Sequence, residues 1–168
     1  MTTTNAAQNG VIPVDDRLRA SGPSEILQAV PYLVGFHPER SVVLIGLMPP
    51  RGRVRVTARF DLDAPPELAE PWFEAAAREG VDRFLIVIYD DATGGRPLPH
   101  SEVIDAFRVM GDASQMSLVD ALYVRASRWW SYICDDPTCC PDEGQPLDEH
   151  GAIAAAAVCI DKYFIRWN

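Results

Sequence analysis

Arg83-Phe84-Leu85-Ile86-Val87-Ile88-Tyr89 decides the fold, because it is the clearest candidate for a buried strand in the sequence. Every residue between its first and last is large and apolar. A short, continuous apolar run of this kind is typical of a strand that is covered on both faces. The loop that follows, Asp90 to Arg96, is rich in turn-forming residues. We therefore predict a central strand whose carboxyl end opens into a polar loop.

Two further strands are predicted earlier in the chain, joined as a hairpin. Ser41 to Met48 is almost continuously apolar, which again indicates a strand buried on both faces. From Arg53 to Phe60, apolar residues alternate with three arginines and a threonine, which predicts a half-exposed strand with a basic outer face. The sequence Pro49-Pro50-Arg51-Gly52 between them predicts the turn.

Three helices are predicted from apolar residues that recur at helical spacing. Their expected limits are Pro23 to Gly35, Asp63 to Gly80, and His100 or Ser101 to Met110. In the second helix we expect Asp63 to be the N-cap. Its expected buried stripe comprises Leu68, Trp72, Phe73 and Ala76.

The last third of the chain predicts a second hairpin and a final helix. Residues 118–124 and 129–133 have the composition of strands, and Ala126-Ser127 lies between them at the expected turn. After a loop that contains three cysteines, residues 149–160 are alanine-rich and predict a helix.

The order of these elements indicates an α/β domain. Strand–helix–strand units with short connections favour a mixed sheet with a parallel centre, and the hairpins add antiparallel edges, with helices packed on the sheet. A chain of 168 residues suits one domain. We predict a mobile leader over residues 1–16, a single domain over 17–158 and an atypical tail over 159–168.

The tail differs from the rest of the chain in composition. The sequence holds fourteen arginines but one lysine, Lys162, and this bias indicates a GC-rich coding sequence. Residues 159–168 are instead enriched in residues with AT-rich codons, namely Lys162, Tyr163, Phe164, Ile165 and Asn168. Either they form an ordinary terminal strand or helix end, or the natural reading frame is lost near Val158.

Charge and hydropathy exclude several classes of partner. A net charge of −9 argues against nucleic acid and against an anionic membrane surface, since both require a basic face. No apolar run approaches the roughly 20 residues that span a bilayer. Residues 1–10 are polar and do not resemble a secretory signal. We therefore expect a cytoplasmic protein with reduced cysteines, whose partner is a protein or a small molecule.

The first candidate site is the cysteine loop, Arg128-Trp129-Trp130-Ser131-Tyr132-Ile133-Cys134-Asp135-Asp136-Pro137-Thr138-Cys139-Cys140-Pro141. Structural zinc takes four sulfur or nitrogen ligands, commonly in pairs two to four residues apart. Cys134 and Cys139 are farther apart than this, and adjacent cysteines rarely face one metal, but His150 could complete a ligand set with Cys134, Cys139 or Cys140. Three interpretations stay open: a structural zinc site, a redox or disulfide pair, and inert buried thiols.

The second candidate site is Asp90-Asp91, directly after the central strand. In open α/β sheets ligands bind beyond the carboxyl ends of the strands, where carboxylates can hold a hard cation or act as a general base. Aspartates are also common turn formers at such positions. His100, at the start of a helix, is expected to be a hydrogen-bonded turn histidine.

The third candidate site is the tryptophan pair, Trp129 and Trp130. Adjacent residues of a strand point to opposite faces, so Trp129 and Trp130 are expected on opposite sides of the sheet. One ring would then belong to the core, whereas the other, with Arg128, could contact a ligand or a partner.

The sequence resembles an actinobacterial family known as domain of unknown function DUF4192. The resemblance lies at Leu18-Arg19-Ala20-Ser21-Gly22-Pro23, at Gly35-Phe36-His37-Pro38, at Val119-Asp120-Ala121-Leu122, and in the cysteine loop. It covers about residues 18–158, whereas the tail departs from the family. It implies an actinobacterial, cytoplasmic origin and supplies no activity or catalytic residue.

Three functional hypotheses follow, and whether the protein is an enzyme stays open. The leading one is a non-catalytic accessory module that binds a protein or small ligand through Trp129, Trp130 and Arg128, which requires an exposed apolar patch around one ring. An alternative is a metal-dependent hydrolase in which the Asp90-Asp91 loop and the cysteine loop share a concavity. Another is a structural zinc-binding assembly domain, which requires converging sulfurs.

Overall fold

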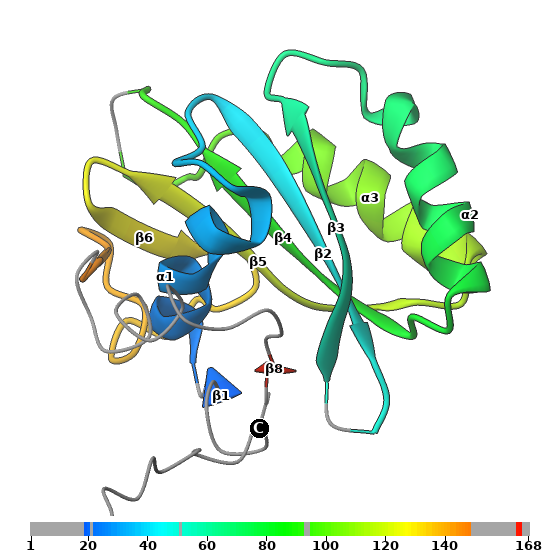
Figure 1. The fold of residues 1–168 in the computed structure, drawn as a ribbon. Helices are drawn as coiled ribbons and strands as arrows, with labels where there is room; N and C mark the ends of the chain where they lie inside the picture. The colour runs from blue at the N-terminus through cyan, green and yellow to red at the C-terminus, as the bar shows by residue number, and fades with distance from the viewer. Residues whose placement is uncertain (1–18, 21, 51, 93–94, 149–163, 166–168) are drawn as a thin grey trace, which may run out of the picture.

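The computed structural model of the chain describes residues 19–20, 22–50, 52–92, 95–148 and 164–165. These form an eight-stranded sheet with helices on both faces (Figure 1). The strands are β1 (Arg19–Ala20), β2 (Ser41–Met48), β3 (Arg53–Asp61), β4 (Arg83–Tyr89), β5 (Ser117–Arg125), β6 (Arg128–Ser131), β7 (Gln145–Pro146) and β8 (Phe164–Ile165). The helices are α1 (Pro23–Val34), the 3-10 helix η2 (Pro66–Ala69), α2 (Glu70–Arg78) and α3 (Ser101–Ala113).

The sheet is mixed, as the sequence predicts. Its strand order is β1-β8-β3-β2-β4-β5-β6-β7, with β4 and β5 parallel at its centre. The pairs β2–β3 and β5–β6 are antiparallel hairpins on either side of that centre. The α/β class, the parallel centre and the antiparallel hairpins are therefore confirmed.

Alternation along the central strands divides the core between the two faces of the sheet. On one face, α1 packs Ile26, Leu27 and Val30 onto the sheet. On the other face, α2 and α3 contribute Phe73 and Phe107. Figure 1 shows α1 in front of the sheet and α3 passing behind it, with α2 beside α3. The residues of β4 from Phe84 to Ile88 are all buried, which confirms that this strand is covered on both sides.

The limits of α1 and α3 follow the sequence signals. Pro23 occupies the first turn of α1, where no amide donor is needed, and Gly35 ends the helix in the left-handed region at φ 89°. Helix α3 starts at Ser101 as expected, but it continues beyond Met110 to Ala113. The chain then enters β5 at Ser117, so the connection is short.

The start of the second helix is where the sequence prediction is wrong. Asp63 is not its N-cap: Pro65 keeps the chain extended at ψ 132°, so a 3-10 turn begins at Pro66 and α2 only at Glu70. Leu68 is 60% exposed rather than buried. Its position in the 3-10 helix, with three residues per turn, takes it off the stripe that Phe73 and Ala76 form in α2.

Strand β6 is shorter than the predicted 129–133, because it ends at Ser131. The leader over residues 1–16, His150, the predicted helix over 149–160 and, except for β8, the tail over 159–168 lie outside the described residues. Among the helices that the structure describes, none combines the length and apolar character needed to cross a membrane.

Candidate functional site

The structure limits the cysteine loop to residues 132–144, which join β6 to β7, and a buried hydroxyl closes its first turn. Ser131 Oγ accepts hydrogen bonds from the backbone N–H groups of Ile133 and Cys134, both at 3.1 Å. The same hydroxyl donates to Asp120 Oδ1 at 2.7 Å. Ser131 and Asp120 are both buried, and their hydrogen bond attaches the turn that carries Cys134 to strand β5.

Two longer side chains hold the rest of the loop. Arg96 Nη2 donates to the carbonyl oxygens of Ser131 at 3.2 Å and Cys134 at 2.9 Å. Trp130 Nε1 donates to the carbonyl of Asp142 at 3.0 Å. Gly144 has φ 78°, and a Cβ there would lie 2.6 Å from the Trp130 ring. The loop backbone therefore packs closely against a core tryptophan.

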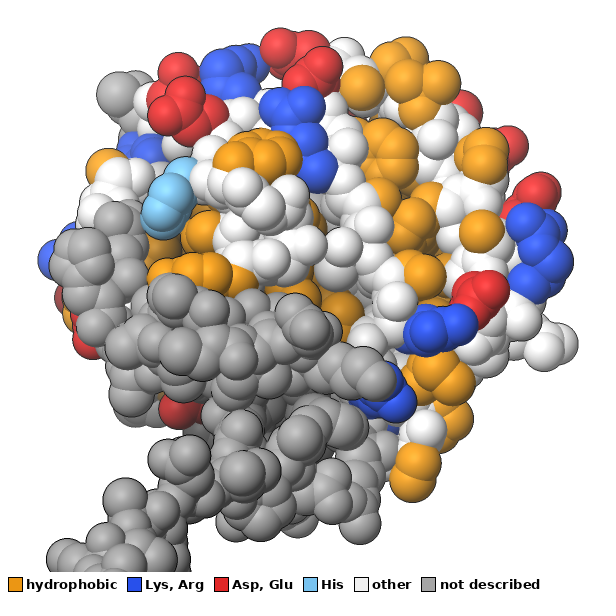
Figure 2. Space-filling model, viewed as in Figure 1, with side chains coloured by type: hydrophobic (Ala, Val, Ile, Leu, Met, Phe, Trp, Pro, Cys, Tyr) orange, Lys and Arg blue, Asp and Glu red, His pale blue; other side chains and the backbone are white. Residues whose placement is uncertain are grey.

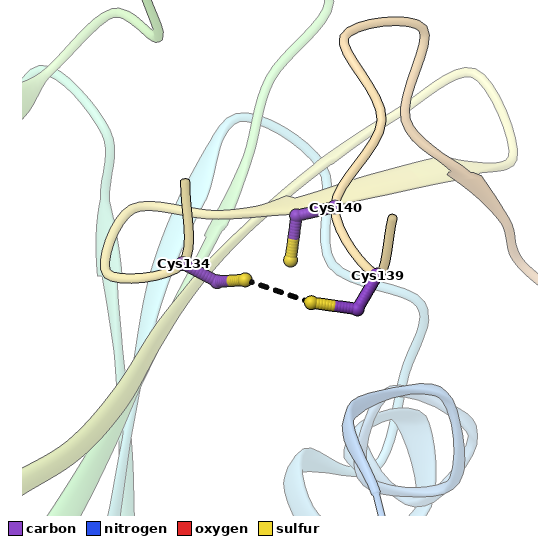
Figure 3. Close-up of side chains that lie close together, drawn as sticks. All are labelled: Cys134, Cys139 and Cys140. Carbon is purple, nitrogen blue, oxygen red and sulfur yellow. Dashed lines mark hydrogen bonds between the residues drawn. The ribbon is translucent and has the colours of Figure 1, made fainter. Parts of the chain in front are cut away.

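The sulfur atoms of Cys134, Cys139 and Cys140 converge inside this loop (Figure 3). All three lie within 4.8 Å of one another, and those of Cys134 and Cys139 are 3.2 Å apart. Cys139 is exposed, Cys134 is half-buried and Cys140 is buried. The backbone N–H of Cys140 donates to the Asp136 carbonyl at 2.7 Å, which turns the adjacent Cys139 and Cys140 toward the same point.

The three thiols differ in acidity. Hydrogen bonds from Cys140 and Cys139 lower the pKa of Cys134, because two thiols can donate to its thiolate. Burial, followed by the interaction with Cys134, raises the pKa of Cys140 to about 12. The pKa of Cys139 is also raised, first by its hydrogen bond to Cys134. The shared hydrogen bonds thus lower the pKa of Cys134 and raise those of its two neighbours.

Such a set of soft ligands suits a thiophilic metal ion. In tetrahedral coordination with Zn–S bonds of about 2.3 Å, two sulfurs are separated by about 3.8 Å. The sulfurs of Cys134 and Cys139 are 3.2 Å apart and all three lie within 4.8 Å, so a shift of well under 1 Å brings that pair to this separation. The cluster can thus hold a metal, with His150, the fourth member of the predicted ligand set, outside the described residues.

The carboxylate of Asp90 is the centre of a second polar cluster. Its side chain is only 2% exposed, and Oδ2 contacts His100 Nε2 at 2.8 Å and the Tyr123 hydroxyl at 3.3 Å. Oδ1 accepts from the backbone N–H groups of Asp91 and Ala92, at 2.8 and 3.3 Å. Burial alone would raise the pKa of Asp90, but the hydrogen bonds from His100 and the two amides outweigh it, so the pKa lies below its usual value.

Arg40 joins this cluster to the surface. Its guanidinium lies 2.7 Å from Asp91, 3.1 Å from Asp63 and 3.4 Å from Asp90. In Figure 2, acidic and basic side chains intermingle along the upper edge of the molecule, where Figure 1 places the α1–β2 connection and the end of β3. The positive charge of Arg40 is therefore shared among three carboxylates.

A cavity of about 830 Å³ lies beside this cluster, between α1 and the carboxyl ends of β4 and β5. Its wall contains residues of α1, of the α1–β2 connection, of both strand ends, of the β5–β6 turn and of the segment after β7: Leu27, Gln28, Pro31, Tyr32, His37, Pro38, Glu39, Arg40, Tyr89, Asp90, Asp91, Val124, Arg125, Ala126, Ser127 and Leu147. Asp90 and Asp91 belong to this wall, but Cys134, Cys139 and Cys140 do not. The structure therefore gives no support to a shared concavity for carboxylates and thiols.

A family model described as "Domain of unknown function (DUF4192)" matches residues 23–161 of the chain, which include both clusters. The chain belongs to this family. None of the curated proteins matches it. Membership of DUF4192 confirms the resemblance seen in the sequence and assigns no chemistry, so the function has to be argued from the residues.

The tryptophans of this DUF4192 domain lie on opposite faces of the sheet, as predicted. Trp130 packs in the core cluster of α2 and α3, and Trp129 in that of α1. Both rings are buried, at 3% and 9% exposure, and Arg128 donates to the Gly144 carbonyl at 2.9 Å. The binding hypothesis requires an exposed apolar patch around one of the rings, and the described structure does not supply it.

Several residues of these sites carry no signal in the sequence. Arg40 and Tyr123 contact Asp90 from positions 50 and 33 residues away along the chain. Arg96 and Ser131 are an ordinary loop arginine and strand serine until the fold brings them together. One hint is available in the sequence: Asp90 and His100 lie close together along the chain. His100 is expected to make a hydrogen bond at the start of a helix, and the structure shows that its partner is Asp90.

Proposed function

We propose that this domain binds one zinc ion through Cys134, Cys139 and Cys140, and that the ion stabilises the β6–β7 loop as a structural element. The convergence of three sulfurs within 4.8 Å supports the proposal. Zinc prefers thiolate ligands in tetrahedral geometry, and sites rich in cysteine are typically structural rather than catalytic. The separation of the cluster from the cavity beside Asp90 also favours a structural role.

The fourth ligand is proposed to be His150 or a water molecule. In the loop itself, the carboxylate of Asp136 already accepts hydrogen bonds from the backbone N–H and the hydroxyl of Thr138, at 2.9 and 2.7 Å. These bonds lower the pKa of Asp136, and its carboxylate is not among the groups that converge on the sulfur cluster. A histidine nitrogen beside three thiolates is a common zinc ligand set.

The protein is proposed to be cytoplasmic, and a cluster of free thiols, which a reducing compartment maintains, supports this proposal. A metal-stabilised loop at the edge of a sheet is a rigid surface on which an assembly partner can dock. The proposed class is accordingly an accessory domain with a structural metal, and its partner a protein or small molecule rather than nucleic acid.

The proposal is tested by metal analysis of protein purified under reducing conditions without chelator. One zinc per chain is expected in the natural protein and in Asp135→Asn, which changes an exposed loop carboxylate outside the sulfur cluster. Cys139→Ser and Cys140→Ser are expected to lose most of the bound zinc. A metal-free natural protein that also takes up no added zinc, with all three thiols reacting freely, would overturn the proposal.

The cavity beside Asp90 supports a second candidate function, the binding of a small organic cation. It lies beyond the carboxyl ends of the parallel strands β4 and β5, where open α/β sheets bind ligands, and its volume is that of a small-molecule site. Glu39 is exposed on its wall, whereas Arg40 and Asp91 pair with each other at 2.7 Å. Arg125, also on the wall, donates to the carbonyl of Ala92. Tyr32, 39% exposed, offers an aromatic surface to a cation.

Matched probes of different charge test this second function. Benzylamine, benzyl alcohol and benzoate are titrated into labelled protein, and amide shifts are followed by nuclear magnetic resonance. Shifts at the cavity wall are expected with benzylamine, and they should weaken in Glu39→Gln and Tyr32→Ala. Equal shifts with all three probes, or shifts elsewhere, would reject a cation site.

A further inference from the structure

We infer that the three-cysteine cluster is a redox switch, in which a peroxide joins Cys134 to Cys139 and thereby releases the metal. The release of metal rests on the function proposed above, whereas the choice of the cysteine pair rests on geometry alone. The sulfurs of Cys134 and Cys139 lie 3.2 Å apart, and their side chains point toward each other (Figure 3).

The exposure of the two sulfurs makes them accessible to a dissolved oxidant. Cys139 is exposed and Cys134 is half-buried, so a small peroxide can reach them from solvent. A disulfide has a sulfur–sulfur distance of about 2.05 Å, so the two sulfurs must approach each other by only about 1 Å. The pair is therefore placed for oxidation by the same loop that gathers the metal ligands.

Cys140 is the cysteine that stays reduced. It is only 8% exposed, which shields its sulfur from an oxidant. It cannot readily pair with its neighbour Cys139, because consecutive Cα atoms are about 3.8 Å apart and disulfides need about 4.4–6.8 Å. Of the three sulfur ligands proposed for the metal, only the thiol of Cys140 would then remain.

The chemistry balances with a peroxide as the named oxidant. One sulfur, as thiolate, attacks a peroxide oxygen; the O–O bond breaks, an S–O bond forms, and the leaving oxygen departs as water after taking up a proton. The second sulfur then attacks the sulfenic sulfur, so that an S–S bond forms, the S–O bond breaks and a second water leaves. The two cysteines lose two electrons in total, and the peroxide gains them.

Disulfide formation removes two of the three sulfur ligands. A disulfide sulfur is no longer a thiolate, and zinc is bound by thiolates. Cys140 and the proposed fourth ligand supply only two of the four ligands of a structural zinc site, so the loop loses its metal in the oxidised state and regains it on reduction. The switch changes the rigidity of the loop at the β6–β7 edge, while the buried strands of the sheet stay unchanged.

The test uses the full chain loaded with zinc and treated with hydrogen peroxide. Zinc release is followed with a chromogenic indicator, and the cross-linked peptides are mapped under non-reducing conditions at matched times. A Cys134–Cys139 cross-link is expected to appear at the same rate as zinc is released, until all the bound zinc is lost. Dithiothreitol with added zinc is expected to reduce the cross-link and to restore the bound metal. Cys140→Ser is expected to keep this cross-link, whereas Cys139→Ser is expected to lose it.

Two results would overturn the inference: a cross-link that contains Cys140 as the main product, or zinc that stays bound after Cys134 and Cys139 are joined. If the chain binds no zinc at all, the proposed function and the release step fail together. The same peptide map on that metal-free chain then decides the pair separately. A Cys134–Cys139 cross-link would support the geometric assignment, and its absence would reject it.

Discussion

The hydroxyl of Ser131 donates a 2.7 Å hydrogen bond to the buried carboxylate of Asp120, and this contact attaches the cysteine loop to the sheet. Asp120 Oδ1 also accepts from the backbone N–H of Ala121 at 2.8 Å. Burial raises the pKa of Asp120, and these two hydrogen bonds oppose the rise. The loop that gathers the thiols therefore depends on a polar pair inside the core.

Ser131→Ala is expected to destabilise the domain by about 1–3 kcal/mol, because it removes one of two hydrogen bonds to a buried carboxylate and leaves two loop amides without their acceptor. Urea unfolding followed by circular dichroism measures the change in the free energy of unfolding. Ser117→Ala, at an exposed serine of β5, is the matched control and should leave stability nearly unchanged. An equal loss of stability in both variants would contradict this role of Ser131.

Asp90→Asn is expected to lower stability near neutral pH by about 1–3 kcal/mol, because the buried carboxylate accepts hydrogen bonds from His100, Tyr123 and two amides. The pKa of Asp90 is lower in the folded than in the unfolded state. Its contribution to the free energy of unfolding is therefore fully present above the pKa of the unfolded state, and it is lost as the pH falls through the pKa of the folded state. The difference between natural protein and variant should hold down to about pH 5 and shrink below about pH 4.

Urea unfolding at a series of pH values measures this dependence. Asp91→Asn is the matched control, since Asp91 is 73% exposed and pairs with Arg40 at the surface, where ion pairs contribute little. A difference that grows as the pH falls would show that the neutral acid, not the carboxylate, is the stabilising form.

Gly144→Ala is expected to destabilise the loop by about 1–3 kcal/mol, because the added Cβ would lie 2.6 Å from the Trp130 ring and the residue has a positive φ of 78°. The tryptophan emission spectrum should shift as the ring moves, and thermal unfolding should begin at a lower temperature. Gly22→Ala is the control, since nothing lies within 4 Å of its added Cβ. An unchanged emission spectrum in Gly144→Ala would show that the contact is easily relieved.

The central sheet could be predicted from the sequence because strands covered on both faces leave an unbroken apolar signature. Phe84 to Ile88 is such a run, and in the neighbouring β2 the residues from Val42 to Leu47 are likewise all buried. The start of α2 was not predictable from N-cap preference alone, since the extended backbone at Pro65 delays the helix beyond Asp63. Local propensity was overruled there by the restricted backbone of proline.

The sites were predictable only in part, for a different physical reason. Spacing along the chain indicated that Cys134 could meet Cys139 or Cys140. Because Cys139 and Cys140 are adjacent, their sulfurs were not expected to face one point. The tight turn from Asp136 to Cys140 brings all three sulfurs together. The partners of Asp90 come from the α1–β2 connection, α3 and β5. Contacts between such distant segments depend on the packing of the whole domain.

Removal of the metal is expected to loosen the cysteine loop without unfolding the sheet. The loop has its own anchors at Ser131, Arg96 and Trp130, and the buried residues of β4 lie in the core, so the metal mainly stabilises residues 132–144. Hydrogen exchange measured on zinc-loaded and chelator-treated protein should show faster exchange in that segment and unchanged exchange in residues 84–88. The same treatment of Cys139→Ser should have no further effect, because this variant lacks the site. Faster exchange throughout the sheet would instead mean that the metal is coupled to global folding.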